Sequence, residues 1–338
     1  MAQKIDWREL GFRYMQTDCF VTSEYHDGAW GKPALQKGTT LPLHVAAACL
    51  HYGQAAFEGL KAFTRRDGSV AVFRPLENAH RMADTARRLV MQAPPDDLFM
   101  ESVRLLLNNN RDWQPPYGTG ASLYIRPLLI GTTPRVGVKP AEDFMLVMLC
   151  MPVGPYYKDG FHPVKAYIQE KYDRAAPHGV GCVKASGNYA AGMLGDMEGK
   201  EMGFPICLYL DSATHTSIDE FGTSNFLGIT ADNTYVTPDS TSVLPSITNG
   251  SLQRIAADLG MKVERRHINI EELSSLREVG ACGTAAVITP IYSITHGSKV
   301  YTYGSESEAG PVLTRLFERI QGIQYGEVED RHGWMVQI

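Results

Sequence analysis

Lys184 lies among glycines, small residues and an apolar valine in residues 179–189, with Tyr189 five positions later. Small neighbours allow another molecule to lie against the backbone, and an apolar setting lowers the pKa of a lysine because it disfavours the charged amine. A lysine with a lowered pKa can form a Schiff base with a carbonyl compound. The alternative is an ordinary surface lysine in a glycine-rich loop, which this short motif alone favours.

Three more segments contain groups that could bind a charged small molecule. Glu220 lies where the pattern of residues 216–225 turns apolar, so its carboxylate either faces a cationic ring nitrogen or is a solvated acid in a turn. Residues 244–250 run into a helix whose N-terminus can bind an anion, or Ser246 is simply its N-cap. Residues 280–286 form a turn of small residues that either presents N–H groups to an anion or is a bulge that requires glycine.

Two arginines raise the question of which groups neutralise them. Tyr124 and Arg126 lie on the same side of an apolar strand because side chains alternate with a period of two. An arginine in such a strand needs a partner. Arg81 lies on the helix face opposite most of the apolar stripe of residues 75–91, which predicts a solvated arginine.

Composition sets wider limits. The chain has 338 residues, a 44% hydrophobic fraction and a net charge of −5, which predict a globular protein, favour two domains and argue against nucleic-acid or anionic-membrane binding. We expect no transmembrane helix and no signal peptide. The six cysteines are scattered without a C-x-x-C pair, which indicates buried thiols of a cytoplasmic protein and no metal site.

Hydrophobic patterns predict a mixture of strands and helices, which favours an α+β fold (mixed α/β) over regular βαβ repeats. Absence of G-x-G-x-x-G and P-loop motifs argues against dinucleotide and nucleoside-triphosphate binding. We expect domains at residues 1–152 and 164–338, joined by a loop at 153–163. The predicted strands are 20–25, 69–73, 121–130, 144–151, 205–211, 225–230, 234–237, 261–266 and an apolar strand pair at 281–294. The predicted helices are 75–91, one around Phe99–Leu106, 188–203, 246–260 and 310–322.

Taken together and in this order, the motifs resemble those of the branched-chain amino acid aminotransferases, which are pyridoxal-phosphate enzymes of fold type IV. The resemblance runs nearly from end to end and is carried by residues 51–63, 74–82, 124–131, 184–189, 219–225, 323–326 and 332–334. It implies a two-domain fold like that of D-amino acid aminotransferase, with a smaller N-terminal α/β domain and a larger C-terminal domain containing a barrel-like sheet. It also implies a homodimer.

The resemblance implies a role for each residue of a cofactor site. Lys184 would hold pyridoxal 5′-phosphate as a Schiff base and transfer the proton of the substrate. Glu220 would pair with the pyridine nitrogen and Tyr189 with the phenolic oxygen. The phosphate would be bound by Arg81, Ile247, Thr248 and Thr284.

A substrate site follows from the same resemblance. An aromatic box of Tyr52, Phe57, Tyr124 and Tyr156 would surround a branched side chain. The N–H groups of Thr284 and Ala285 would bind the substrate carboxylate, Arg126 would help to accept a dicarboxylic substrate, and Val136 and Val138 would reach the partner's site. The substrates would be leucine, isoleucine or valine with 2-oxoglutarate, giving the 2-oxo acid and glutamate.

Three positions depart from the family pattern: Ser186 and Ser246 replace common glycines, and Cys282 replaces a usual serine. The chain also lacks the C-x-x-C pair of the mammalian enzymes, which argues against redox regulation. Two alternatives remain. One is an enzyme of the same fold, a D-amino acid transaminase or aminodeoxychorismate lyase, and the other is a cofactor-binding regulatory protein without catalysis.

Overall fold

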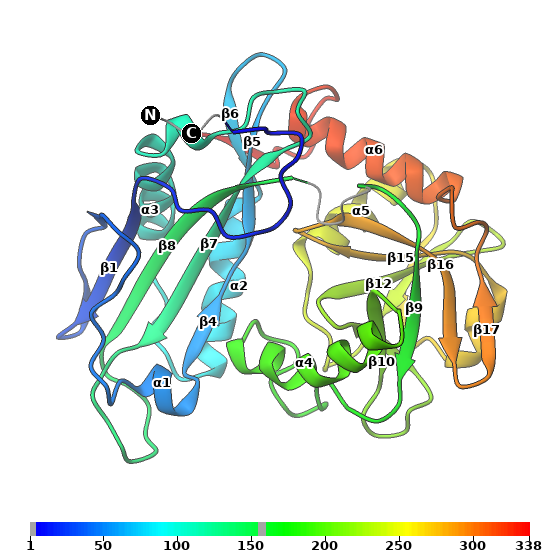
Figure 1. Ribbon diagram of the computed structural model, residues 1–338, viewed down its shortest axis with the longest axis horizontal. Helices are drawn as coiled ribbons and strands as arrows, with labels where there is room; N and C mark the ends of the chain where they lie inside the picture. Colours follow the sequence, from blue (N-terminus) through cyan, green and yellow to red (C-terminus); the bar gives the residue numbers. More distant parts are fainter. Residues whose placement is uncertain (1–4, 155–159) are drawn as a thin grey trace. The chain divides into compact units, whose positions relative to one another are not determined.

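The computed structural model describes residues 5–154 and 160–338, which form two compact units (Figure 1). The first contains residues 5–154, Val183–Gly187 and Gly322–Ile338, and the second contains residues 160–182 and Asn188–Gln321. The units therefore differ from the expected ranges 1–152 and 164–338 at two segments that lie far along the chain. Backbone pairing between distant segments causes the difference: β18 (Met335–Gln337) pairs with β6 (Val70–Phe73), and Ala185 bridges to Ala56.

The first unit is built on an antiparallel sheet with the strand order β18-β6-β5-β7-β8-β1-β2, to which β3 adds at β1 and β4 at β7. The apolar runs predicted as buried strands form β7 and β8, which pair along their whole length. The strands are β1 (Phe20–His26), β2 (Ala29–Trp30), β3 (Ala34–Gln36), β4 (Ala55–Phe57), β5 (Leu60–Thr64), β6 (Val70–Phe73), β7 (Ser122–Gly131), β8 (Phe144–Val153) and β18 (Met335–Gln337).

Two helices pack against this sheet, α2 (Pro75–Arg88) and α3 (Asp96–Asn108), as Figure 1 shows. Pro75 occupies the first turn of α2, where its missing N–H leaves no bond unmade. The helix ends three residues before the predicted Met91, because Val90 adopts a left-handed φ of 55°. Met82, Phe99 and Leu106 are fully buried between helices and sheet. The short helices are α1 (Ala48–Tyr52) and η1 (Arg111–Trp113).

The second unit contains the expected barrel-like sheet. Six strands close a ring in the order β11-β10-β9-β16-β15-β12, and β12 pairs back to β11. Strands β13 and β14 extend the sheet beyond β12, and β17 adds at β16. The strands are β9 (Val164–Gln169), β10 (Ile206–Leu210), β11 (Ile218–Phe221), β12 (Ser224–Thr230), β13 (Tyr235–Pro238), β14 (Val263–Arg266), β15 (Leu276–Gly283), β16 (Val287–His296) and β17 (Lys299–Thr302).

The helices of the second unit follow the predicted ranges to within a few residues. They are α5 (Ile247–Asp258), the short η2 (Ile270–Ser275), and most of α4 (Ser186–Glu201) and of α6 (Pro311–Tyr325). Helix α4 lies close to β10 because glycines face the strand: a Cβ on Gly195 would be 2.7 Å from the Tyr209 hydroxyl. Within residues 5–154 and 160–338, the helices lack the length and hydrophobicity needed to cross a bilayer.

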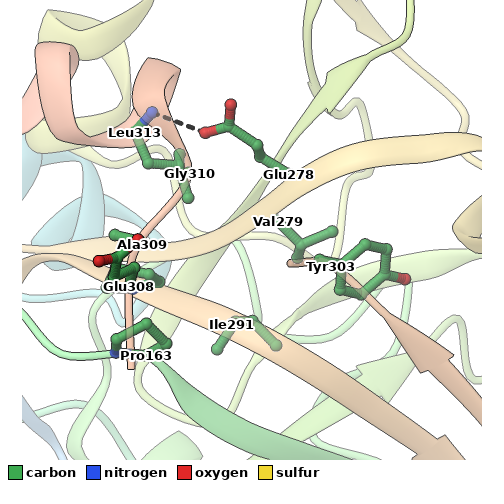
Figure 2. A pocket seen from close by; sticks show the side chains of 10 residues that line it. Pro163, Glu278, Val279, Ile291, Tyr303, Glu308, Ala309, Gly310 and Leu313 are labelled. Carbon is green, nitrogen blue, oxygen red and sulfur yellow. Dashed lines mark hydrogen bonds between the residues drawn. The ribbon is translucent and has the colours of Figure 1, made fainter. Parts of the chain in front are cut away.

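A buried carboxylate holds the start of α6, as Figure 2 shows. Glu278 on β15 accepts hydrogen bonds from the N–H groups of Val312 (3.1 Å) and Leu313 (2.9 Å). These two N–H groups lie in the first turn of α6 and have no acceptor within their own helix, so the Glu278 carboxylate accepts their hydrogen bonds instead. Gly310 makes the approach possible, since a Cβ there would overlap the Glu278 carboxylate.

We predict that Glu278→Ala destabilises the protein by about 1–3 kcal/mol, the penalty for buried donors that lose a charged acceptor. Thermal unfolding of the variant, followed by circular dichroism, would show a lower midpoint. The control is Glu308→Ala, because Glu308 lies beside the same pocket but is exposed. Equal midpoints for the two variants would contradict this role of Glu278.

A second prediction concerns Lys61, which is buried in β5. Burial lowers the pKa of its amine from 10.5 to about 8. Between these pH values the unfolded chain binds more protons than the folded one, so the contribution of Lys61 to stability rises with pH in that window. We expect Lys61→Met to be more stable than the wild type at pH 7, and this difference to shrink by pH 10. A constant difference in unfolding midpoint over this range would contradict the prediction.

Candidate active site

The backbone around Lys184 is fastened to the first unit. Phe57 donates its N–H to the Lys184 carbonyl at 3.2 Å, and the Lys184 N–H is donated to the Thr85 hydroxyl at 3.0 Å. Val183 and Ala185 on either side are buried. Lys184 therefore lies in an ordered segment anchored to β4 and α2, in contrast to the surface loop that the glycine-rich motif alone favours.

The amine of Lys184 lies against an aromatic ring. Its Nζ is 4.7 Å from the ring centroid of Phe57, at the end of β4. The Arg126 guanidinium carbon is also 4.7 Å from this ring centroid. A ring face attracts a cation while it excludes water from one side of it. Phe57 thus lies beside the two basic groups expected to meet cofactor and substrate.

Arg81 on α2 is held by a fully buried carboxylate. Its Nε donates to Glu58 Oε1 and its Nη2 to Glu58 Oε2, each at 2.8 Å. The Glu58 side chain is 0% exposed and that of Arg81 is 11% exposed. The helical position predicted a solvated arginine, and this prediction is wrong. Periodicity along one helix could not indicate the pairing, because the partner lies on the segment between β4 and β5.

Tyr124 and Arg126 lie on the same side of β7, as the strand period predicts. The Arg126 Nη2 donates to the Tyr124 hydroxyl at 3.0 Å, which provides the polar partner that the arginine needs. Gly59 lies against that hydroxyl, and a Cβ at this position would overlap it. The glycine after Glu58 therefore determines where the Tyr124 hydroxyl can lie.

Tyr52, Val136 and Val138 lie at the surface of the first unit. The Tyr52 hydroxyl donates to the Val136 carbonyl, which joins α1 to the loop after β7. Val136 is 76% exposed and Val138 is 83% exposed. Neither valine is buried within its own chain. Tyr156, the fourth residue of the expected aromatic box, lies outside the described residues.

In the second unit, Glu220 is buried on β11 and is held by three donors. Arg174 pairs with Glu220 Oε1, and both side chains are less than a tenth exposed. The Leu244 N–H donates to Oε1 and the Asn225 Nδ2 to Oε2, each at 3.1 Å. Glu220 is therefore a fixed carboxylate inside the fold and not the solvated acid of a turn. Its partner Arg174 was missed from the sequence, although an arginine next to Ala175 and Ala176 gave a weak signal.

Arg174 also interacts electrostatically with Tyr189 on α4. Burial lowers the pKa of the Arg174 guanidinium, and the nearby Tyr189 and Asp219 act in the opposite direction. The same buried cation thus influences both Glu220 and Tyr189, the two residues expected at opposite polar atoms of a pyridine ring. An arginine stays charged at this burial.

The predicted anion-binding turns are also in the second unit. Ser246 is the N-cap of α5 and accepts a hydrogen bond from the Asn249 N–H at 3.1 Å, with Ile247 and Thr248 in the first turn. Thr284 and Ala285 form the turn between β15 and β16. This turn ends at Val287, whose φ of 66° is strained for a β-branched residue. Such strain is typical of functional turns.

Two of the departures from the family pattern also have a structural explanation. Ser246, which replaces a common glycine, supplies the N-cap of α5. Cys282 is fully buried on β15, and burial raises the pKa of its thiol. The thiol is therefore not reactive, and Cys282 is a packing residue.

Each unit by itself contains groups whose chemistry suits one part of a phosphorylated pyridine aldehyde. The first unit supplies an amine for the aldehyde and a paired arginine for the phosphate. The second unit supplies a buried carboxylate, a tyrosine and a helix N-terminus whose N–H groups can bind an anion. No group of three or more histidine, cysteine or acidic residues in the described part of the chain could hold a metal ion instead.

Comparison with known proteins decides the family. Residues 55–294 match the sequence profile of the family described as amino-transferase class IV. The chain belongs to the class IV aminotransferases. Within this family, it is 46% identical to the branched-chain-amino-acid aminotransferase of Haemophilus influenzae over 340 residues, covering 99% of both chains. It is 43% identical to the Helicobacter pylori enzyme of the same name, covering 99% of this chain and 98% of the relative.

Solved structures agree. This aminotransferase matches the Escherichia coli branched-chain amino acid aminotransferase with a TM-score of 0.80 and 26% identity, covering 95% of this chain and 99% of the other. It matches the T.th. branched-chain amino acid aminotransferase with pyridoxamine 5′-phosphate with a TM-score of 0.81 and 25% identity, covering 96% and 99%. The fold type IV architecture and the branched-chain aminotransferase function predicted from the motifs are confirmed.

Proposed function

We propose that this aminotransferase catalyses the reversible transfer of the amino group of L-leucine, L-isoleucine or L-valine to 2-oxoglutarate, giving the 2-oxo acid and L-glutamate, with pyridoxal 5′-phosphate as cofactor. Enzymes of fold type IV use this cofactor. The fixed position of Glu220 carries the proposal for this chain: Arg174, Asn225 and the Leu244 N–H hold its carboxylate in one orientation. A carboxylate held in this way can meet a ring nitrogen without reorganising.

Besides Lys184, six residues would hold the cofactor, which when bound supplies an electron sink for the substrate carbanion. Arg81, the N–H groups of Ile247 and Thr248, and Thr284 bind the phosphate. Glu220 keeps a proton on the ring nitrogen, since a carboxylate favours the cationic form of a nearby base. Tyr189 donates a hydrogen bond to the phenolic oxygen.

Lys184 is the catalytic base of this proposal. Its amine would hold the aldehyde carbon of the cofactor. Once the amino group of the substrate has displaced it, the free amine would accept the proton of the substrate α-carbon and donate it again in the next step. The anchoring of its backbone at Phe57 and Thr85 limits its motion to the side chain. Short, directed proton transfer of this kind contributes about 10²- to 10⁴-fold to a rate.

The substrate side combines apolar walls with a few polar groups. The N–H groups of Thr284 and Ala285, with Tyr124, bind the α-carboxylate. Tyr52 and Phe57 would line the pocket for the branched side chain, where the family resemblance also expects Tyr156, and Arg126 would meet the second carboxylate of 2-oxoglutarate or glutamate. A hydrophobic pocket discriminates one methylene by only about 1–3 kcal/mol, so all three branched amino acids are substrates.

The test is an amino-donor panel with 2-oxoglutarate as acceptor, using the purified holoenzyme. We expect turnover of L-leucine, L-isoleucine and L-valine and a visible cofactor absorption that borohydride removes. Turnover of D-alanine without L-leucine would instead support a D-amino acid transaminase. Absence of any borohydride-sensitive absorption would contradict the use of pyridoxal 5′-phosphate.

We further propose that two copies of the chain form the working enzyme. The surface of the first unit exposes Val45, Leu50, Val136 and Val138, and helix α4 of the second exposes Met193, Leu194 and Met197. Contiguous exposed apolar residues are typical of protein interfaces. Val136 and Val138 would then complete the partner's substrate site.

Substitution of Val138 separates this role from folding. We expect the Val138→Glu chain to fold normally, because Val138 is exposed on its own chain. The variant should lower kcat/KM for L-leucine by about tenfold or more, because it places a charge in an apolar contact between the two copies. Val300→Glu on β17 is the control, since Val300 is also exposed, at 58%. Sedimentation velocity measures the oligomeric state, and unchanged activity with unchanged size in Val138→Glu would contradict the proposal.

We also propose a cytoplasmic location. All six cysteines are free thiols, and three of them, Cys150, Cys207 and Cys282, are almost completely buried. Unpaired cysteines are typical of a reducing compartment. Cell fractionation with an antibody to the chain would test it.

A further inference from the structure

Glu58 has no role in the function proposed above, yet it is among the most buried charged groups of the first unit, with a side chain 0% exposed. Besides the two bonds from Arg81, its Oε2 accepts from the Asn78 Nδ2 at 2.7 Å and from the Gly59 N–H at 3.2 Å. Each of these contacts requires the oxygens of Glu58 to accept. A carboxylate buried at this depth is costly unless it is fully paired, so the arrangement calls for an explanation.

The geometry points to Glu58 as the positioning residue of the phosphate site. The two carboxylate oxygens of Glu58 accept hydrogen bonds from Nε and Nη2, which form one edge of the Arg81 guanidinium. A guanidinium carries five N–H donors on more than one edge, and Glu58 contacts the edge formed by Nε and Nη2. The planar fork is thereby held in one orientation, which removes the conformational entropy that a mobile arginine would lose when it binds phosphate.

Two effects of the carboxylate on phosphate binding oppose each other. Its negative charge repels a phosphate, and its hydrogen bonds orient the cation that attracts the phosphate. The bidentate contact at 2.8 Å and the anchoring of Glu58 by Asn78 favour the second effect, because charge-assisted bidentate pairs are strong and directional. The inference rests on the proposed role of Arg81 as a phosphate ligand.

The test compares two probes that differ only in the phosphate. The purified full-length chain, stripped of cofactor, is titrated with pyridoxal 5′-phosphate and with pyridoxal, and the ratio of the two dissociation constants reports the contribution of the phosphate. Glu58→Gln should lower this preference by about tenfold, equivalent to one charge-assisted hydrogen bond. The affinity for pyridoxal should stay within about twofold.

Further variants make the result decisive. Glu58→Asp should restore part of the preference, and Asn78→Ala, which removes the anchor of Glu58 and leaves Arg81 intact, should lower it less than Glu58→Gln. These two keep the inference testable if Glu58→Gln does not fold. The control is Glu77→Gln. Glu77 lies on α2, the helix of Arg81, and pairs with Arg74 at 3.4 Å. This variant should leave the preference for pyridoxal 5′-phosphate over pyridoxal unchanged.

An unchanged preference in Glu58→Gln, or tighter binding of pyridoxal 5′-phosphate, would overturn the inference. Arg81→Met distinguishes this failure from failure of the proposed function. If Arg81→Met loses the preference while Glu58→Gln keeps it, only the positioning role of Glu58 is wrong. If Arg81→Met also keeps it, Arg81 is not the phosphate ligand and both proposals fail.

Discussion

Lys184→Ala should abolish transamination, with a loss in kcat of at least about 10⁴-fold. The variant lacks both the amine that anchors the cofactor and the base that moves the α-proton, and each of these contributes separately. The fold should survive, because the segment is held by backbone bonds of Lys184 to Phe57 and Thr85 that alanine can also make. Single-turnover rates with L-leucine measure the effect.

The second readout for Lys184 is covalent. After borohydride reduction of the wild type, peptide mapping should find the cofactor on the peptide containing Lys184, whereas the variant should retain none after denaturation. Lys299→Ala, at an exposed position on β17, is the control and should behave as the wild type. A Lys184→Ala protein that turned over at the wild-type rate would refute the assignment of this lysine.

Glu220→Gln should lower kcat by about 10²- to 10³-fold, the usual effect of removing one preorganised electrostatic contact in a buried site. An amide cannot hold a proton on the ring nitrogen as a carboxylate does, so the electron sink weakens. The variant also leaves the buried Arg174 without its carboxylate, and we therefore expect a lower unfolding midpoint.

A neighbouring acid provides the control for Glu220. Asp219 is adjacent on β11 and, like Glu220, interacts electrostatically with Arg174, but strand alternation turns its side chain to the other face. Asp219→Asn removes a buried carboxylate of the same unit and should leave kcat within a few-fold of the wild type. Equal losses in Asp219→Asn and Glu220→Gln would show that the loss arises from the charge balance around Arg174 and not from a contact that only Glu220 makes.

The fold could be predicted from the sequence where the signal was local. The long apolar runs of β7 and β8, Pro75 at the start of α2 and Ser246 at the cap of α5 each need only neighbouring residues to be recognised. Eight strands of two to six residues were not predicted, because the pattern of so short a segment does not by itself distinguish a strand from a loop: β2, β3, β4, β5, β9, β11, β17 and β18. The places of β4, β9 and β18 depend on pairing with partners far along the chain.

The sequence by itself determined the family and the chemistry that this chain can perform, because the motifs around Lys184, Glu220 and Arg81 occur together and in order. Only the tertiary structure decided how the charged groups are held. Arg81 meets Glu58 across 23 positions of the chain, and Glu220, on strand β11 of the closed barrel, meets Arg174. Ion pairs of this kind form because the topology of a sheet brings distant residues together, and no local pattern of residues records that topology.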